Sequence, residues 1–177
     1  EINSLGDLQG LKIRMPGFGG EVLARGGATT VHLPGSEILP SLQTGVIDGA
    51  MIDPTTLKSF KLAEVTNFVT QGMDTTISEF FLIMNRDVFA DLDDTAQQAV
   101  LDAGREAALT AGSTWLKIAD GAMADFAAAD GKEVITLSED EASKFDEASA
   151  AAVEQIVADA EAEGIPAKAW IDALAAD

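Results

Sequence analysis

Apolar residues in the first part of the chain fall into short groups whose spacing alternates between that of strands and that of helices. Brief apolar runs bounded by glycine or proline predict three strands, at 11–15, 29–33 and 46–52. Between them, apolar positions at helical spacing that end at glycine predict helices at 20–27 and 36–45. Strands that alternate with helices form βαβ units, so we predict an α/β fold with a mostly parallel sheet flanked by helices.

The rest of the chain predicts longer helices and three further strands. The strands are expected at 66–71, 77–85 and 132–137. The helices are expected at 55–64, 93–129, 138–164 and 166–176. Because 93–129 is long for one helix in a compact domain, we expect a bend or break near Gly104, Gly112 or Gly121. Ser138 and Glu141 have the spacing of a capping box.

Composition and charge exclude several classes of partner. The chain has 177 residues and is 47% hydrophobic, which is enough for one domain or a little more with a sizeable core. Its 30 acidic and 11 basic residues give a net charge of −19, which would repel nucleic acid and anionic membranes. No apolar run is long enough to predict a membrane span.

Motifs for catalysis are missing from the sequence. There is no cysteine, which excludes disulfides, thiolate nucleophiles and zinc–thiolate sites. No G-x-S-x-G, phosphate-binding loop or G-x-G-x-x-G pattern is found, and the stretch at 17–27 fails the spacing of the last of these. An enzyme would rest on the α/β fold alone, which is weak support.

Arg14 is the strongest candidate for a binding residue. It stands at the carboxyl end of a predicted strand, where ligand crevices open in parallel sheets. A guanidinium group presents a planar fork that matches a carboxylate in two parallel hydrogen bonds. The alternatives are an exposed residue at the sheet edge and a structural pair with Asp48 or Glu37.

Three stretches of the sequence together resemble one known family. They are "SLGDLQGLKIRMPG" at 4–17, "GSEILPSLQTGVIDGA" at 35–50 and "FFLIMNRDVFADLDDTAQQAVLDAGREAA" at 80–108. In order and spacing they are similar to the solute-binding proteins of TRAP transporters, the DctP-type family. The resemblance extends over essentially the whole chain and is closest to the branch that binds 2-oxo and 2-hydroxy acids.

The resemblance implies a periplasmic receptor and not an enzyme. Such receptors hold a small organic acid between two lobes and deliver it to sodium-coupled TRAP permease subunits in the membrane, without a required cofactor. In the family, the arginine at the position of Arg14 forms a two-point salt bridge with the ligand carboxylate.

The resemblance also implies how the chain is divided. The fold would be that of a periplasmic binding protein, with a long connecting helix and one lobe largely missing. Residues 1–80 and 121–177 would form the second, carboxyl-terminal lobe. Residues 81–120 would return to the first lobe and include the connecting helix.

Four further residues become ligand-binding candidates through the resemblance. Met51 and Asp53 lie on the turn that faces the ligand in the family, although Met51 stands where the oxo-acid branch has glutamate. Asp53 is equally suited to begin a helix, and one residue can do both. Glu79 matches a cleft position but would also suit an exposed strand face, and Phe18 would line the pocket or join the core.

A cation and a second copy of the chain are the remaining expectations. Asp53 and Glu79 could supply oxygen ligands to Na⁺ or Ca²⁺ bound with the ligand. The alternative function is self-association through the acidic, alanine-rich helix at 139–163, which would form a homodimer. Trp115 and Trp170 fall on helix faces, where packing is the expected role.

Overall fold

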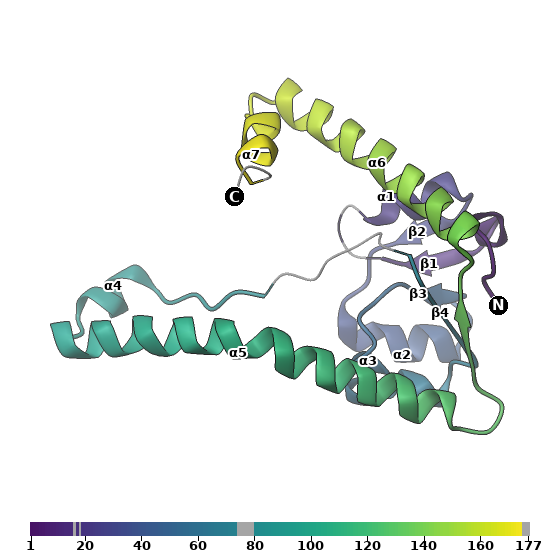
Figure 1. Ribbon diagram of the computed structural model, residues 1–177, viewed down its shortest axis with the longest axis horizontal. Helices are drawn as coiled ribbons and strands as arrows, with labels where there is room; N and C mark the ends of the chain where they lie inside the picture. The colour runs from purple at the N-terminus through teal and green to yellow at the C-terminus, as the bar shows by residue number, and fades with distance from the viewer. Residues whose placement is uncertain (16, 18, 74–79, 175–177) are drawn as a thin grey trace.

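The computed structural model describes residues 1–15, 17, 19–73 and 80–174 and has a mixed α/β fold (Figure 1). Its first sheet contains three parallel strands in the order β2-β1-β3. These strands are β1 (Lys12–Arg14), β2 (Thr29–Val31) and β3 (Gly49–Ala50). They alternate with helices α1 (Gly19–Arg25) and α2 (Gly35–Gln43), as the sequence predicts.

A second parallel sheet joins segments that are distant in sequence. It pairs β4 (Phe68–Gln71) with β5 (Glu133–Thr136). A short 3-10 helix, η1 (Leu5–Leu8), precedes β1. The predicted helix at 55–64 is divided into α3 (Thr56–Ser59) and the 3-10 helix η2 (Leu62–Glu64), because Lys61 between them has a left-handed backbone with φ of 57°.

Helices cover both faces of the sheets, and each face has its own apolar core. On one face α1 and α6 (Glu139–Ala162) surround a core that contains Ile13, Leu23 and the fully buried Phe145. On the other face α2, α3 and the end of α5 (Asp94–Ala127) surround Ile38 and Phe126. The two layers lie above and below the strands in Figure 1. The predicted parallel sheet flanked by helices is confirmed.

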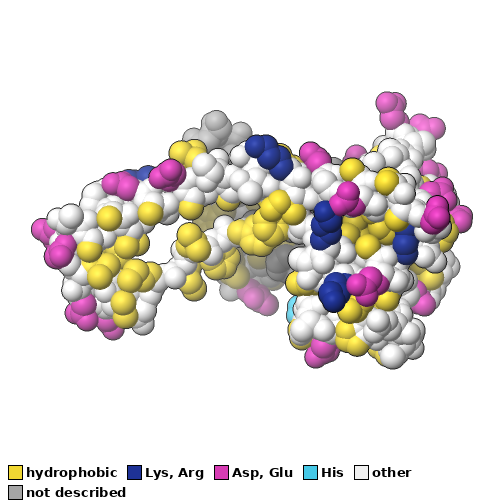
Figure 2. Space-filling view, turned by 90° about the horizontal axis from the view of Figure 1, so that it is seen from below, with side chains coloured by type: hydrophobic (Ala, Val, Ile, Leu, Met, Phe, Trp, Pro, Cys, Tyr) yellow, Lys and Arg dark blue, Asp and Glu magenta, His cyan; other side chains and the backbone are white. Residues whose placement is uncertain are grey.

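Two helical arms project from the body (Figure 1). One is α5, which has 34 residues and is about 50 Å long at 1.5 Å per residue. The short α4 (Arg86–Ala90) lies at its far end. The other arm is the carboxyl-terminal half of α6, on which α7 (Ala167–Leu174) folds back. Hydrophobic side chains are exposed along the α5 arm in Figure 2.

The expected break in α5 and the expected strand over residues 80–85 are not found. The helix does not break at Gly104, Gly112 or Gly121, because each glycine faces open space and costs only about 1 kcal/mol in a helix. Residues 80–85 form no strand, although an apolar strand was predicted at 77–85, because no strand among the described residues runs beside them to accept their hydrogen bonds. Residues 77–79 lie outside the described residues.

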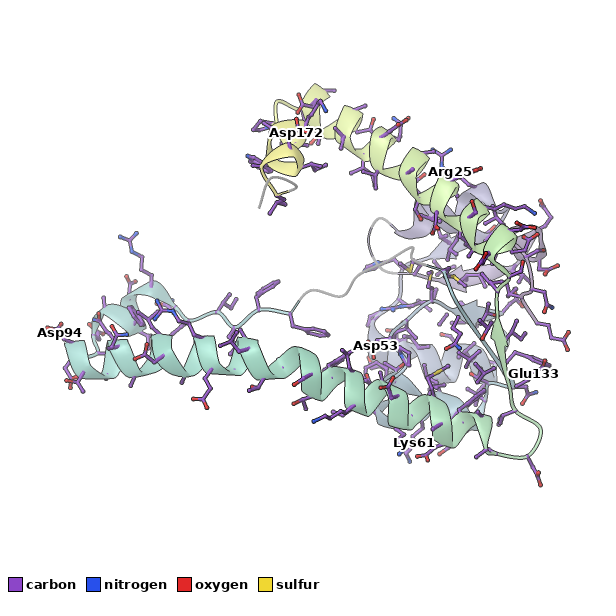
Figure 3. The ribbon with its side chains drawn as sticks, viewed as in Figure 1. Arg25, Asp53, Lys61, Asp94, Glu133 and Asp172 are labelled. Atoms are coloured by element: carbon purple, nitrogen blue, oxygen red, sulfur yellow. The ribbon has the colours of Figure 1, made fainter. Side chains whose placement is uncertain are left out.

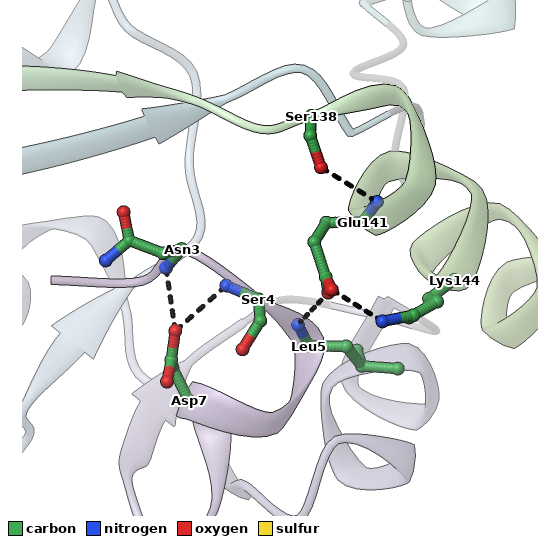
Figure 4. A network of polar contacts seen from close by, with 7 residues as sticks. All are labelled: Asn3, Ser4, Leu5, Asp7, Ser138, Glu141 and Lys144. Atoms are coloured by element: carbon green, nitrogen blue, oxygen red, sulfur yellow. Dashed lines mark hydrogen bonds and ion pairs between the residues drawn. The ribbon is translucent and has the colours of Figure 1, made fainter.

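A polar network attaches the amino-terminal segment to α6 (Figure 4). The Ser138 hydroxyl accepts a hydrogen bond from the Glu141 backbone N–H at 3.3 Å, so Ser138 caps α6 as predicted. The Glu141 carboxylate does not complete the capping box. It accepts a hydrogen bond from the Leu5 backbone N–H at 3.4 Å and pairs with Lys144, which raises the pKa of Lys144. Half of the capping box is therefore replaced by a long-range contact.

The burial of Phe145 gives a test of the core. Phe145→Ala should lower the free energy of unfolding by about 3–5 kcal/mol, because the lost side chain leaves a cavity between α6 and the first sheet. Urea denaturation measures this change. Glu147→Ala on the same helix is exposed and should change the free energy by less than about 0.5 kcal/mol. Equal effects of the two substitutions would contradict the proposed core.

Candidate functional site

The candidate site lies at the carboxyl edge of the three-stranded sheet. Arg14 is the last residue of the central strand and is paired in register with Val31 and Ala50. The carboxyl ends of three parallel strands therefore meet at Arg14. Asp48 lies near the opposite end of the strands, where its carboxylate accepts a hydrogen bond from the Lys12 backbone N–H at 2.8 Å.

Arg14 is a buried cation that one hydrogen bond holds within the described part of the chain. The side chain is only 8% exposed, and its Nε–H donates to the Leu33 carbonyl oxygen at 3.0 Å. Among the described residues, no carboxylate forms an ion pair with Arg14, and its two terminal nitrogens have no hydrogen-bond partner. Neither alternative role is found there, because Arg14 is not exposed and pairs with neither Asp48 nor Glu37.

The electrostatics of Arg14 favour an anion at this place. Burial lowers the pKa of Arg14, but an arginine starts so far above neutrality that it remains charged. A buried charge is costly unless hydrogen bonds or a counter-ion compensate it. One hydrogen bond from Nε orients the guanidinium group, and no described residue occupies the fork of terminal N–H groups, which suits an anion.

Met51 and Asp53 follow β3 beside Arg14. The Met51 backbone N–H donates to the Arg14 carbonyl oxygen at 2.8 Å, and Met51 packs against the core of the first sheet. One Asp53 carboxylate oxygen accepts a hydrogen bond from the Thr55 backbone N–H at 2.8 Å, in the turn that leads into α3. The other accepts a hydrogen bond from the Trp115 indole N–H at 2.7 Å. Asp53 thus supports a helix start and also reaches α5.

Burial and hydrogen bonding act on Asp53 in opposite directions. Partial burial raises the pKa of its carboxyl group, but the hydrogen bonds from Trp115 and Thr55 together outweigh this effect. The pKa of Asp53 is therefore lowered, and the group is an anion near neutral pH. Asp53 lies between the body and α5 in Figure 3.

Trp115 is the residue that sequence reasoning missed. We expected it only to pack on a helix face, and it does pack, with its ring 4.6 Å from the Phe80 ring centroid at an interplanar angle of 45°. Its indole N–H also binds Asp53, 62 positions away in the chain. A partly buried tryptophan needs a partner for its N–H, but no local spacing identifies that partner.

Two predicted site residues, Phe18 and Glu79, lie outside the described residues. Within the ranges that the structure describes, no group of three or more histidine, cysteine, aspartate or glutamate side chains could hold a metal ion. Both carboxylate oxygens of Asp53 already accept hydrogen bonds. A cation at Asp53 would therefore have to displace a hydrogen bond or share an oxygen.

A cavity among the described residues lies apart from Arg14. It has a volume of about 650 Å³ and runs between β3 and β4, with Met51 and Asp53 on its lining but not Arg14. Much of the lining is apolar and belongs to the two cores, and neither β3 nor β4 has a strand partner on the side that faces it. We interpret it as a gap between the sheets and not as the ligand crevice. None of the described helices could cross a membrane.

The Asp53–Trp115 hydrogen bond predicts a change in acid behaviour. Trp115→Phe should raise the pKa of Asp53, because the indole donor stabilises the carboxylate. Since the folded pKa is depressed, this stabilisation is present above the unfolded pKa of about 3.9 and is lost as pH falls through the folded pKa. The difference in free energy of unfolding between wild type and Trp115→Phe should therefore become smaller as the pH falls. NMR titration would measure the pKa of Asp53, and urea denaturation at several pH values would measure the free energies. Trp170→Phe should leave the pKa of Asp53 unchanged.

Comparisons with known proteins agree with these features. The model of bacterial extracellular solute-binding protein family 7, DctP, matches residues 1–160. A monocarboxylate 2-oxoacid-binding periplasmic protein of Nostoc sp. is 52% identical over 50 residues, 28% of this chain and 14% of that protein. A solute-binding protein of Albidiferax ferrireducens is 34% identical over 107 residues, 56% of this chain and 30% of that protein.

Solved structures give the same result. A TRAP periplasmic solute-binding protein from Bordetella bronchiseptica, with bound mandelate, matches with a TM-score of 0.78 and 27% identity, covering 95% of this chain and 54% of that one. A marine metagenome TRAP solute-binding protein specific for aromatic acid ligands matches with a TM-score of 0.83 and 27% identity, covering 97% and 55%. The chain thus spans about half the length of these solved relatives.

The predicted resemblance to TRAP transporter solute-binding proteins is confirmed by the family match and by the shared fold. Both findings concern solute-binding proteins, in agreement with the expectation of a receptor and not an enzyme. The chain belongs to family 7 of the bacterial extracellular solute-binding proteins, the DctP family.

Proposed function

We propose that this chain is the ligand-anchoring part of an extracytoplasmic receptor for a small organic acid. Arg14 holds the ligand carboxylate through two parallel hydrogen bonds from its terminal nitrogens. The observation that carries this proposal is the burial of Arg14 at the sheet edge, with its fork free among the described residues. A carboxylate is one of the anions whose two oxygens match that fork.

The relatives support a carboxylate as the ligand. The Nostoc relative is a monocarboxylate 2-oxoacid-binding protein, and the Bordetella structure contains mandelate. Both kinds of ligand carry one carboxylate on a small body. By this similarity the receptor works in the periplasm and delivers its ligand to the TRAP permease subunits of a sodium-coupled transporter.

We propose that the α5 arm connects this lobe to a second one. Residues 1–80 and 121–177 would form the carboxyl-terminal lobe, and 81–120 would return to the first lobe through the connecting helix. An unusual concentration of exposed apolar side chains on the arm, apart from those beside Asp53, supports this division: Phe81, Leu82, Ile83, Met84, Val88, Val100, Leu101, Leu109, Leu116 and Ile118. A patch of this kind marks a surface that another part of a protein covers.

Lobe closure would strengthen the anchor. When the first lobe covers the sheet edge, it removes water from the Arg14–carboxylate pair and lowers the local dielectric constant, so the attraction grows. Ligand then stabilises the closed state to the extent that it binds this state better. Met51, Asp53, Glu79 and Phe18 are the further proposed contacts, and a Na⁺ or Ca²⁺ ion at Asp53 and Glu79 stays a prediction.

Self-association is the second candidate function. It is favoured by exposed apolar side chains at the end of the α6 arm: Val153, Ile165, Trp170, Ile171 and Leu174. A homodimer through this surface would give a sedimentation coefficient that rises with protein concentration. If self-association is the function, organic acids should not change the unfolding temperature.

Substitution of Arg14 tests the anchor. In the full-length receptor, Arg14→Ala should weaken binding of its organic acid by about 100-fold or more, because one partner of a desolvated charge pair is removed. Isothermal titration calorimetry and the ligand-induced rise in unfolding temperature measure the loss. Arg14→Lys keeps the charge but not the fork and should recover only part of the affinity. Arg105→Ala, an exposed arginine on α5, is the matched control. Unchanged affinity in Arg14→Ala would contradict the proposal.

Truncations on the arm test the division into lobes. In the full-length receptor, Phe81→Ala and Leu82→Ala should each lower the free energy of unfolding by about 2–5 kcal/mol, because the first lobe would bury these side chains. Leu174→Ala on α7, which is similarly exposed and lies outside this segment, should have little effect. Losses below about 0.5 kcal/mol for both arm variants in urea denaturation would mean that no lobe covers this surface.

A further inference from the structure

An aromatic pair stands at the junction of the α5 arm and the body. We use this name for Phe80 and Trp115, whose rings contact each other across the space between the extended segment 80–85 and α5. Both rings keep an exposed surface, 69% of Phe80 and 37% of Trp115. Exposed aromatic surface at such a junction is unusual for a packing contact, because burying these rings would be favourable.

Contacts place the aromatic pair at the same sheet edge as Arg14. The Met51 backbone N–H binds the Arg14 carbonyl oxygen, which joins the end of β1 to the turn after β3. Asp53 is two residues farther along this turn, and its carboxylate binds the Trp115 indole N–H at 2.7 Å. Phe80 in turn packs against the Trp115 ring. The turn after β3 therefore connects Arg14 to the aromatic pair.

Asp53 has a defined part in this arrangement. Its two carboxylate oxygens each accept one hydrogen bond, from Thr55 and from Trp115, so Asp53 holds the turn and the indole ring together. The hydrogen bond to Trp115 fixes the orientation of the indole ring. The lowered pKa of Asp53 also keeps a negative charge close to the site, and this charge would repel a second carboxylate on the ligand.

We propose that Trp115 and Phe80 determine ligand specificity, and that the ligand is a monocarboxylate with an aromatic body. This inference rests on the proposed function, since Arg14 must hold the carboxylate for the aromatic pair to meet the ring. The flat ring of the ligand would contact the exposed surface of the aromatic pair, either stacked on it or edge to face. Asp53 is a positioning residue that acts through Trp115. Sugar acids and dicarboxylates are disfavoured, because the described site offers them apolar surface and negative charge.

The test compares ligands that share a head group and differ only in the body. Isothermal titration calorimetry on the full-length receptor would measure phenylpyruvate against pyruvate and mandelate against lactate. We expect the aromatic member of each couple to bind at least about tenfold more tightly, which is the size of one aromatic contact. Phe80→Leu and Trp115→Leu should each reduce this preference by about threefold or more. The small acids should lose less than about twofold.

Matched controls separate this effect from damage to the fold. Phe89→Leu on α4 and Trp170→Leu on α7 replace the same residue types away from the junction and should leave the preference unchanged. Trp115→Phe keeps a ring but loses the bond to Asp53, and it should retain more of the preference than Trp115→Leu. Phe80 is mostly exposed in the described structure, so Phe80→Leu gives a variant whose folding is the less affected of the two.

The outcomes distinguish the two proposals. If pyruvate or lactate binds as tightly as its aromatic counterpart and this binding requires Arg14, the aromatic inference is overturned while the anchor stands. A preference for aromatic acids that survives both Phe80→Leu and Trp115→Leu would also overturn it. If no acid of either kind binds, the anchor fails and the inference fails with it.

Discussion

The burial of one positive charge at the carboxyl edge of a parallel sheet is the constraint on which this account depends. Arg14 is 8% exposed in a chain of net charge −19, yet none of the described carboxylates pairs with it. The central position of β1 forces this placement, because both neighbouring strands run parallel and end beside the same residue. One hydrogen bond to the Leu33 carbonyl orients the group, and the terminal nitrogens, which have no partner among the described residues, suit a bound anion.

Helix α5 is attached to the body beside this edge. Two polar contacts attach α5 to the body, the Asp53–Trp115 hydrogen bond and an ion pair between Lys58 and Asp125. The second pair is exposed and contributes little stability by itself. Ala122 and Phe126 of α5 are both buried in the core on that face and add apolar contact to the attachment. The amino-terminal part of α5 projects from the body, and apolar side chains along it are exposed (Figures 1 and 2). In the lobe closure that we propose, α5 would be the connecting element, held to the body near one end.

Local features of the fold could be predicted from the sequence, and long-range ones could not. The strands at β1 and β2 and the helices between them follow from apolar runs that end at glycine or proline. Arg14 could be found because the fork of its side chain and the end of its strand are both visible in a few residues. Segment 80–85 was predicted as a strand because its composition suits one, but a strand exists only where a partner lies beside it.

The same limit applies to the site. Asp53 was expected to start a helix or to serve the site, and its carboxylate contacts both the turn before α3 and Trp115. The second contact spans 62 positions and leaves no pattern in the sequence. Glu141 behaves similarly, because the capping box predicts a local bond for its carboxylate whereas the folded chain places Leu5, 136 positions away, within reach. Tertiary contacts of this kind compete with local rules and override them when the partner N–H has no other acceptor.

A crystal structure of the full-length receptor with its organic acid bound would test the central claim most directly. We predict that both terminal nitrogens of Arg14 lie about 2.7–2.9 Å from the two carboxylate oxygens of the ligand, with the Nε–H still bound to the Leu33 carbonyl. A ligand carboxylate bound elsewhere, with the Arg14 fork occupied by an aspartate or glutamate of the receptor itself, would contradict the account.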